Sequence, residues 1–336
     1  MTPIDDLWKS LDQDPSALPG LLLRRLDVSG FDVHLTQERP SRMPGLLVYA
    51  DDKPGTLWKY LKSSHGLDVR LDVRPGQRAT LSLTEKNEHF HSVFTALVTD
   101  LVRGLEHLAT TPPAKRPLTL DYLSARISSW QSCLREFPEG MSGEKAAGLF
   151  GELRMLTMLL NAGLDPMLCL DRWTGPANAI QDFQFDQLTI EVKTSRQTQP
   201  ANVRITSERQ LDTTTQNRLV LVHLSLDERA DTSATTLPEA VAAVRAILGT
   251  GKAGLTLDER LVRYGYLDAH EHRYGNRSYA VRAIDFIDVV DPIPRLVEKD
   301  LPTGVGRVSY DLSLAACEPF RLDEQTMQTL ISTITS

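Results

Sequence analysis

Residues 181–197 read QDFQFDQLTIEVKTSRQ, and this stretch decides the expected fold of the central part of the chain. Its apolar residues alternate with polar ones, which predicts two half-buried β-strands. The apolar residues are Phe183, Phe185, Leu188, Ile190 and Val192. The charged residues do not fit a plain hairpin, because Asp182, Glu191 and Lys193 lie among apolar neighbours where charges are normally avoided.

A two-residue turn at Asp186 and Gln187 would fix the register of this hairpin. Asp182 then lies opposite Glu191, and Lys193 shares a strand face with Glu191. Opposed carboxylates repel each other, so Lys193 or a divalent cation must compensate, and carboxylate oxygens suit Mg²⁺ or Mn²⁺. The alternative is an ordinary hairpin with a solvated charged face, and a slip of one residue would turn Asp182 to the other face.

The segment before the hairpin predicts a helix that carries a further acid. Ser142 is a good N-cap for this helix and Gly163 a natural stop. Glu152, within GLFGELRML, lies at the face expected to pack on the sheet and would reach the same cation. Alternatively it lies at the edge of that face and pairs with Arg154 or Lys145.

The rest of the chain predicts a mixed α and β protein. Short strand-like runs fill the N-terminal third; they span 21–28, 31–36, 45–50, 67–73 and 79–84. Helices are expected at 88–107 and 118–137, separated by the linker TTPPAKRP (110–117). The later predicted segments are an extended run at 165–172, a strand at 201–206, a short helix from Ser207, a strand at 218–226, helices at 237–249 and near 256–264, strands at 278–290 and 305–314, and a helix from Asp323.

These patterns divide the 336 residues into three segments. We expect an N-terminal β-rich domain with a closing helix (1–112), a core (118–226) and a C-terminal α/β extension packed on the core (237–336). No apolar run is long enough to span a bilayer, and the acidic N-terminus does not read as a signal peptide, so a cytoplasmic protein is expected.

The formal net charge of −7 argues against a surface that binds nucleic acid non-specifically. The window 193–209 nevertheless carries four basic residues against one acid, a local charge of +3. Taken alone, this window also fits a solvated strand and loop with scattered arginines.

Asp182 followed by Glu191-Val192-Lys193 resembles the D…(D/E)xK motif of the PD-(D/E)XK phosphodiesterase superfamily, with Glu152 in place of the acid on that superfamily's first helix. More closely, the chain resembles an uncharacterised bacterial family of PD-(D/E)XK proteins linked to restriction and phage defence. The segments that carry this likeness are GLFGELRML, Trp173 to Phe183, IEVKTS, SERQL (207–211), LVRYGY (261–266) and VSYDLSL (308–314). Gln181 directly precedes Asp182, at the position where the PD-(D/E)XK motif has proline.

The resemblance implies a restriction-endonuclease-like core, in which a mixed central sheet is flanked by helices, and metal-dependent hydrolysis of DNA. It implies that Asp182, Glu191, the carbonyl of Val192 and Glu152 hold Mg²⁺, with Mn²⁺ as a substitute. Lys193 would position or deprotonate the attacking water, or stabilise charge on the phosphate. The residues expected to contact nucleic acid are Arg196, Arg204, Gln210 and Ser195, although surface arginines, a helix-start glutamine and a strand-ending serine fit equally.

The resemblance also implies partners. A defence system would supply a methyltransferase or an ATPase, and a double-strand cut needs two active sites, which a homodimer would provide. A non-catalytic scaffold that binds DNA or a partner through a nuclease-like core is the alternative function, and RNA is the alternative substrate.

Overall fold

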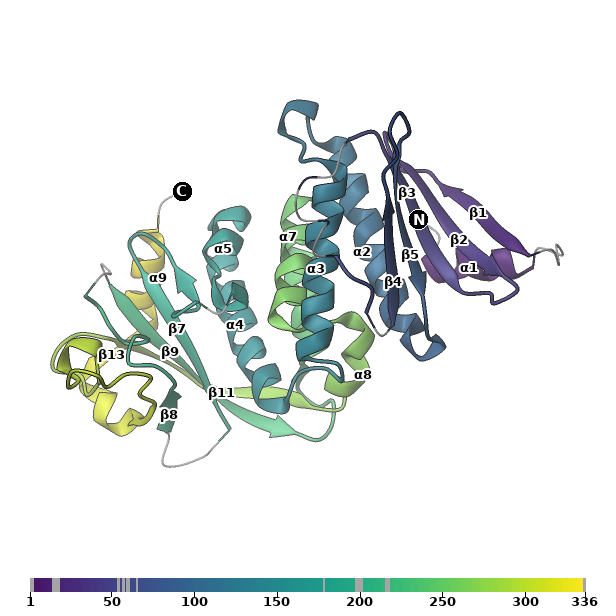
Figure 1. Ribbon diagram of the computed structural model, residues 1–336. Helices are drawn as coiled ribbons and strands as arrows, with labels where there is room; N and C mark the ends of the chain where they lie inside the picture. The colour runs from purple at the N-terminus through teal and green to yellow at the C-terminus, as the bar shows by residue number, and fades with distance from the viewer. Residues whose placement is uncertain are drawn as a thin grey trace. The chain divides into compact units, whose positions relative to one another are not determined.

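The computed structural model describes residues 3–13, 19–52, 55, 58, 61–64, 66–177, 179–196, 202–214 and 218–334 (Figure 1). The fold mixes α-helices and β-sheets, as the sequence predicted. The chain divides into two compact units, Met1–Pro138 with Leu267–Ala269, and Glu139–Tyr266 with His270–Ser336. The boundary therefore follows the helix predicted at 118–137, which we had expected in the core, and no boundary separates the core from residues 237–336.

The first unit is an antiparallel sheet with helices. Its elements are α1 (Ile4–Asp12), β1 (Gly20–Leu26), β2 (Asp32–Arg39), β3 (Pro44–Ala50), β4 (Leu67–Asp72), β5 (Ala79–Glu85), η2 (Glu88–Phe90), α2 (His91–Thr110), η3 (Pro113–Lys115) and α3 (Thr119–Glu136). The strand order is β1-β2-β3-β5-β4, with every neighbouring pair antiparallel. Each strand lies close to a predicted run, whereas α1 was not predicted.

Helix α2 supplies much of the core of this unit, because its apolar residues recur at helical spacing. Phe94, Leu97 and Leu101 are fully buried, and the ring of Trp8 in α1 stacks on Phe94 at 5.5 Å. These contacts explain why the amphipathic α1 folds onto α2.

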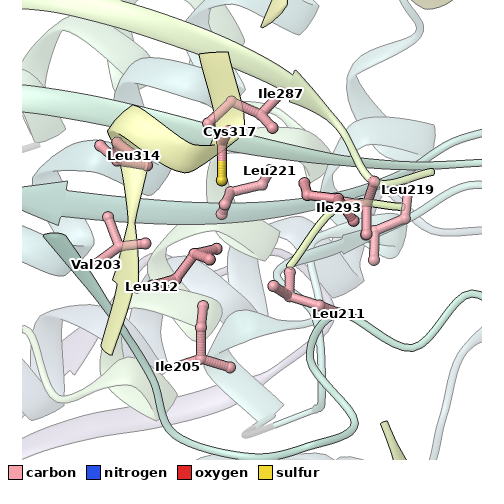
Figure 2. Close-up of a cluster of buried hydrophobic side chains, with 11 residues drawn as sticks. Val203, Ile205, Leu211, Leu219, Leu221, Ile287, Ile293, Leu312, Leu314 and Cys317 are labelled. Atoms are coloured by element: carbon pink, nitrogen blue, oxygen red, sulfur yellow. The ribbon is translucent and has the colours of Figure 1, made fainter. Parts of the chain in front are cut away.

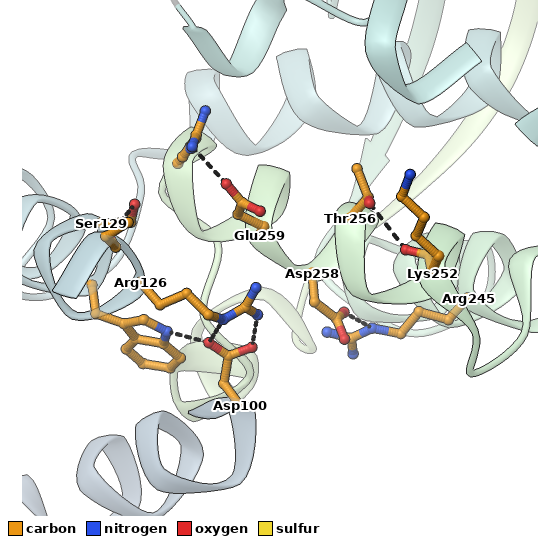
Figure 3. Close-up of polar contacts among 11 residues, drawn as sticks. Asp100, Arg126, Ser129, Arg245, Lys252, Thr256, Asp258 and Glu259 are labelled. Carbon is orange, nitrogen blue, oxygen red and sulfur yellow. Dashed lines mark hydrogen bonds and ion pairs between the residues drawn. The ribbon is translucent and has the colours of Figure 1, made fainter. Parts of the chain in front are cut away.

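A buried ion pair joins α2 to α3. Figure 3 shows the guanidinium of Arg126 against the carboxylate of Asp100, which also accepts a hydrogen bond of 3.0 Å from the indole nitrogen of Trp130. Arg126 and Trp130 are 5% and 4% exposed. A buried charge needs such a partner, since removing one member leaves the other unpaired.

The second unit carries the predicted hairpin. Its elements are α4 (Gly143–Asn161), α5 (Pro166–Arg172), η4 (Gly175–Ala177), β6 (Phe183–Gln184), β7 (Thr189–Ser195), β8 (Asn202–Ile205), β9 (Leu219–Arg229), β10 (Thr235–Thr236), α6 (Leu237–Leu248), α7 (Lys252–Tyr264), η5 (Asp268–His270, shared with the first unit), α8 (Glu271–Tyr274), β11 (Ser278–Asp288), η6 (Glu298–Asp300), β12 (Tyr310–Ser313), η7 (Leu314–Phe320), β13 (Arg321–Leu322) and α9 (Glu324–Ser332).

The central sheet of this unit is mixed. Its order is β10-β11-β9-β7-β6, with β13 on β11, and β7 runs parallel to β9 while the other pairs are antiparallel. Helix α4 packs closely on β7 at Gly151, where an added Cβ would lie 2.5 Å from the Cγ2 of Thr194. Val192 and Thr194 therefore face α4, and the alternating Glu191, Lys193 and Ser195 face the other way.

An apolar cluster lies on that other face of the sheet, where the β8–β12 pair also contributes. Figure 2 shows its side chains converging; the cluster comprises Val203, Ile205, Leu211, Leu219, Leu221, Ile287, Val289, Ile293, Leu312, Leu314 and Cys317. The polar residues of β7 thus share a sheet face with this apolar cluster.

The predicted ends of α4 are confirmed. The Ser142 side chain accepts a hydrogen bond from the backbone N–H of Lys145, and Gly163 follows the helix with a φ of 87°. The extended prediction for 165–172 was wrong. The Asp165 side chain caps α5 by accepting a hydrogen bond from the N–H of Leu168, and Pro166 suits the first helical turn. This short apolar run therefore forms a helix.

Three further expectations need correction. The strand expected at 305–314 is confined to β12, Tyr310–Ser313. The residues after Ser207 form turns instead of a short helix. The strand expected at 218–226 continues to Arg229, because β11 pairs with it along its length. Within the described part of the chain, no helix combines the length and apolar character needed to cross a membrane.

Candidate active site

The hairpin has the expected register. Phe183 pairs with Ile190, and the N–H of Phe185 donates to the carbonyl of Leu188 at 2.9 Å, so the turn is formed by Asp186 and Gln187. Alternation along a two-residue hairpin leaves little freedom in this pairing. Asp182 lies one residue before β6, at the open end of the ladder.

Asp182 reaches across the end of the hairpin. Its Oδ2 accepts a hydrogen bond of 2.7 Å from the backbone N–H of Val192. Its own carbonyl accepts from the N–H groups of Thr174 and Gly175 at 2.7 and 3.2 Å. Because the N–H and C=O of one strand residue point to the same edge, the Val192 carbonyl faces the edge on which Asp182 lies.

Glu191 is buried beside Lys193, as the strand alternation predicted. Its Oε1 accepts from the Nζ of Lys193 and from the Nε2 of Gln210, both at 2.7 Å. Its Oε2 is buried and has no hydrogen-bond partner, and the residue is only 1% exposed. A buried carboxylate oxygen without a partner is costly, so this atom needs a donor or a cation.

Gln210 was predicted to contact nucleic acid, which stays a prediction; in the structure its Nε2 donates to Glu191. Its Oε1 accepts from the N–H of Thr206 at 2.8 Å, which fixes the amide orientation. The Nε2 of Gln181 holds the same turn by donating to the carbonyl of Arg209 at 3.0 Å. Gln181 lies beside Asp182 in the sequence. This polar neighbour was the sequence feature that could have indicated a side chain holding the turn that carries Gln210.

Glu152 also lies in the site. Its Oε2 accepts from the indole nitrogen of Trp173 and its Oε1 from the hydroxyl of Tyr264, both at 2.6 Å. Both contacts come from residues other than the expected alternative partners, Arg154 and Lys145. Trp173 and Tyr264 were not predicted as site residues, although both lie in segments that carried the family likeness.

Gly175 allows two of the carboxylates to approach each other. An added Cβ would lie 2.2 Å from the Oε2 of Glu152 and 3.2 Å from the Oδ1 of Asp182. Any side chain would occupy the space between α4 and the hairpin. The glycine thus lets the loop pass close to both acids.

Burial raises the pKa of all three carboxyl groups. The pKa of Glu191 rises to about 8, through burial and then the charge of Asp182, against the opposing effect of Lys193. Burial raises the pKa of Asp182 to about 6, against the Val192 N–H and Lys193. The pKa of Glu152 lies well above its usual value, chiefly through burial and the charge of Asp182.

In the part of the chain that the structure describes, Lys193 is the lysine that forms an ion pair with one of these acids, Glu191. Three buried carboxylates beside Lys193 cannot all ionise without a further positive charge. Among the described residues, no group of three or more His, Cys, Asp and Glu side chains is arranged to hold a metal ion. Mg²⁺ requires fewer side-chain ligands than that, since it binds through one or two carboxylates and keeps several waters.

The donor set that fits Mg²⁺ is therefore Asp182, Glu191 and the Val192 carbonyl. The unpartnered Oε2 of Glu191 is the observation that supports this fit. Both oxygens of Glu152 already accept strong hydrogen bonds, which makes it the less suited of the predicted ligands.

The other predicted nucleic-acid contacts lie further along β7 and on β8. Arg196 pairs with Glu228 at 2.7 Å, Arg204 pairs with Asp311 at 3.2 Å, and Ser195 lies 2.7 Å from the Nε2 of His223. Ser195, Arg196 and Arg204 line one pocket of about 290 Å³. Their role toward nucleic acid stays a prediction.

Comparison with known proteins gives one family. No curated protein and no solved structure matches the chain. The family described as “Putative PD-(D/E)XK family member, (DUF4420)” matches residues 4–315, which covers most of the chain and includes every residue of the candidate site. The chain therefore belongs to this PD-(D/E)XK family.

Proposed function

We propose that this protein is a Mg²⁺-dependent endonuclease that hydrolyses DNA phosphodiester bonds. The observation that carries the proposal is the buried, unpartnered Oε2 of Glu191, beside Lys193 and at the hairpin end where Asp182 lies. Membership of a PD-(D/E)XK family supports the same chemistry.

The residues of the chain have distinct roles in this proposal. When bound, Mg²⁺ supplies charge stabilisation at the phosphate and a more acidic water. Asp182 and Glu191 hold it, and the Val192 carbonyl adds a neutral oxygen ligand. Lys193, held at 2.7 Å from Glu191, is placed to orient a water or to neutralise charge that develops on the phosphate.

Glu152 and Gln210 act by positioning in this scheme. Gln210 and Lys193 share one oxygen of Glu191, which leaves the other oxygen for the cation. Glu152 lies near Asp182 but is held by Trp173 and Tyr264, so it contributes negative potential toward the cation.

We further propose that the substrate is DNA and that a partner supplies targeting. An acidic protein gains little non-specific affinity for the phosphate backbone, so a methyltransferase or ATPase of a restriction or defence system would bring it to DNA. A homodimer would place two active sites on one duplex.

Cleavage of supercoiled plasmid in the presence of Mg²⁺ tests the proposal. We expect Asp182→Ala, Glu191→Ala and Lys193→Ala each to lower the rate by at least about 100-fold while the fold is retained. Glu324→Gln, at an exposed position in α9, is the matched control and should cleave at the wild-type rate. Full cleavage by any one of the three site variants would refute the assignment.

Calorimetry with Mg²⁺ and a parallel assay on RNA separate the alternative functions. A wild-type protein that binds no Mg²⁺ in calorimetry and cleaves neither DNA nor RNA favours the non-catalytic scaffold. Cleavage of single-stranded RNA without cleavage of DNA would keep the mechanism and change the substrate.

A further inference from the structure

A second group of reactive side chains lies on three adjacent strands of the central sheet. Ser195 ends β7, His223 lies within β9, and Asp285 lies within β11. In the sheet register Lys193 pairs with His223, and His223 pairs with Asp285. The three side chains therefore share the sheet face opposite α4.

These side chains form a continuous hydrogen-bonded chain. The Oγ of Ser195 lies 2.7 Å from the Nε2 of His223, and the Nδ1 of His223 lies 3.1 Å from the Oδ2 of Asp285. The other carboxylate oxygen of Asp285 accepts from Arg321 at 2.6 Å. Nucleophile, base and orienting acid thus stand in the order found in Ser-His-Asp hydrolases.

The chemistry of the partners fixes the direction of each hydrogen bond. The carboxylate of Asp285, ion-paired with Arg321, only accepts, so the Nδ1 of His223 carries the proton. Burial lowers the pKa of His223, which is 1% exposed, and keeps the ring neutral. Its Nε2 is then a lone-pair acceptor for the Ser195 hydroxyl, which is the arrangement that activates a serine.

Ser195 also lies at a pocket. Ser195 is 9% exposed and lines the pocket of about 290 Å³ described above, together with Arg196 and Arg204. A guanidinium carries five N–H donors, which suits stabilisation of a developing oxyanion. Lys193 is instead directed to Glu191, so the serine is not part of the proposed metal site.

We propose that Ser195, His223 and Asp285 form a second catalytic centre, in which Ser195 is the nucleophile toward small carboxylic esters that fit this pocket. The Ser195 oxygen bonds to the acyl carbon while its proton moves to the Nε2 of His223. The bond from the acyl carbon to the leaving oxygen then breaks, and that oxygen takes the proton from His223. Water releases the acid by the reverse proton path and restores the Ser195 hydroxyl.

A fluorophosphonate probe and p-nitrophenyl acetate test the proposal on the full-length protein. We expect stoichiometric labelling by the probe, with the adduct mapped to Ser195 by peptide mass spectrometry, and ester hydrolysis that the labelling abolishes. His223→Gln keeps hydrogen-bonding capacity without the base and should lower both rates by at least about 100-fold. Asp182→Asn should leave both unchanged, which separates this centre from the proposed nuclease.

Ser225→Ala is the matched control. Ser225 pairs with Ser195 across the strands but accepts from Arg282 at 3.1 Å, so its removal should leave labelling intact. Absence of labelling in a folded wild-type protein, or an adduct on any residue other than Ser195, would overturn the proposal. Because the adduct is mapped on the wild-type protein, the test does not depend on a Ser195 variant that folds.

Discussion

Glu191→Gln should stabilise the metal-free protein while removing metal binding. Burial and the Asp182 charge raise the pKa of Glu191 from 4.5 to about 8. At pH 7 the folded state therefore holds this group protonated, whereas the unfolded chain ionises it, which costs about 3 kcal/mol of stability. The glutamine amide removes that cost, but it places an NH₂ where the Oε2 has no partner, which costs about 1 kcal/mol. The expected gain is about 2 kcal/mol, or roughly 5 °C in melting temperature.

The pH dependence of this gain has a definite sign. The folded-state pKa lies above the unfolded one, so the Glu191 contribution to stability is fully present below pH 4.5 and is lost as the pH rises through about 8. The advantage of Glu191→Gln over the wild type should vanish at about pH 5, where the pH-dependent gain equals the cost of the unpartnered amide, and be largest above pH 8.

Chemical denaturation in EDTA across this pH range measures the free energy of unfolding, with the exposed Glu324→Gln as control. Added Mg²⁺ should stabilise the wild type and the control but not Glu191→Gln. A variant that is less stable than the wild type at every pH, or a difference that does not change with pH, would contradict the raised pKa of Glu191.

Three further predictions concern the acids of the candidate site. Gly175→Ala places a Cβ 2.2 Å from the Oε2 of Glu152, so we expect a destabilisation of about 1–3 kcal/mol in thermal denaturation and loss of cleavage. Tyr264→Phe removes the 2.6 Å hydrogen bond to Glu152 and should lower the free energy of unfolding by about 1–3 kcal/mol; an unchanged value would contradict the contact. Mg²⁺ affinity should rise between pH 6 and pH 8, with proton release seen by calorimetry in two buffers, because Asp182 and Glu191, with pKa values of about 6 and 8, must ionise to bind; a pH-independent affinity would contradict this.

Local signals predicted the hairpin well. Strict alternation and a two-residue turn leave one register that buries the apolar face, so the pairing of Phe183 with Ile190 followed from the sequence. The capped helix α4 was predictable for the same reason, since Ser142 and Gly163 mark its ends.

Contacts between residues far apart in the sequence could not be predicted from such local patterns. Tyr264 lies 112 residues from Glu152, and Trp173 lies 21 residues away, so no spacing rule connects them. His223 offered a weak signal, a polar residue within the apolar run LVLVHLSL, but its partners come from two other strands. The run at 165–172 was misjudged because a short apolar segment fits a buried strand or a helix, and Asp165 decided the outcome as a cap.

A crystal soaked in Mn²⁺ and measured at the manganese absorption edge tests the central claim most directly. We expect one strong anomalous peak within bonding distance of the carboxylates of Asp182 and Glu191, lost in Glu191→Gln. A well-ordered site without a peak, or a peak whose protein ligands include neither carboxylate, would contradict it.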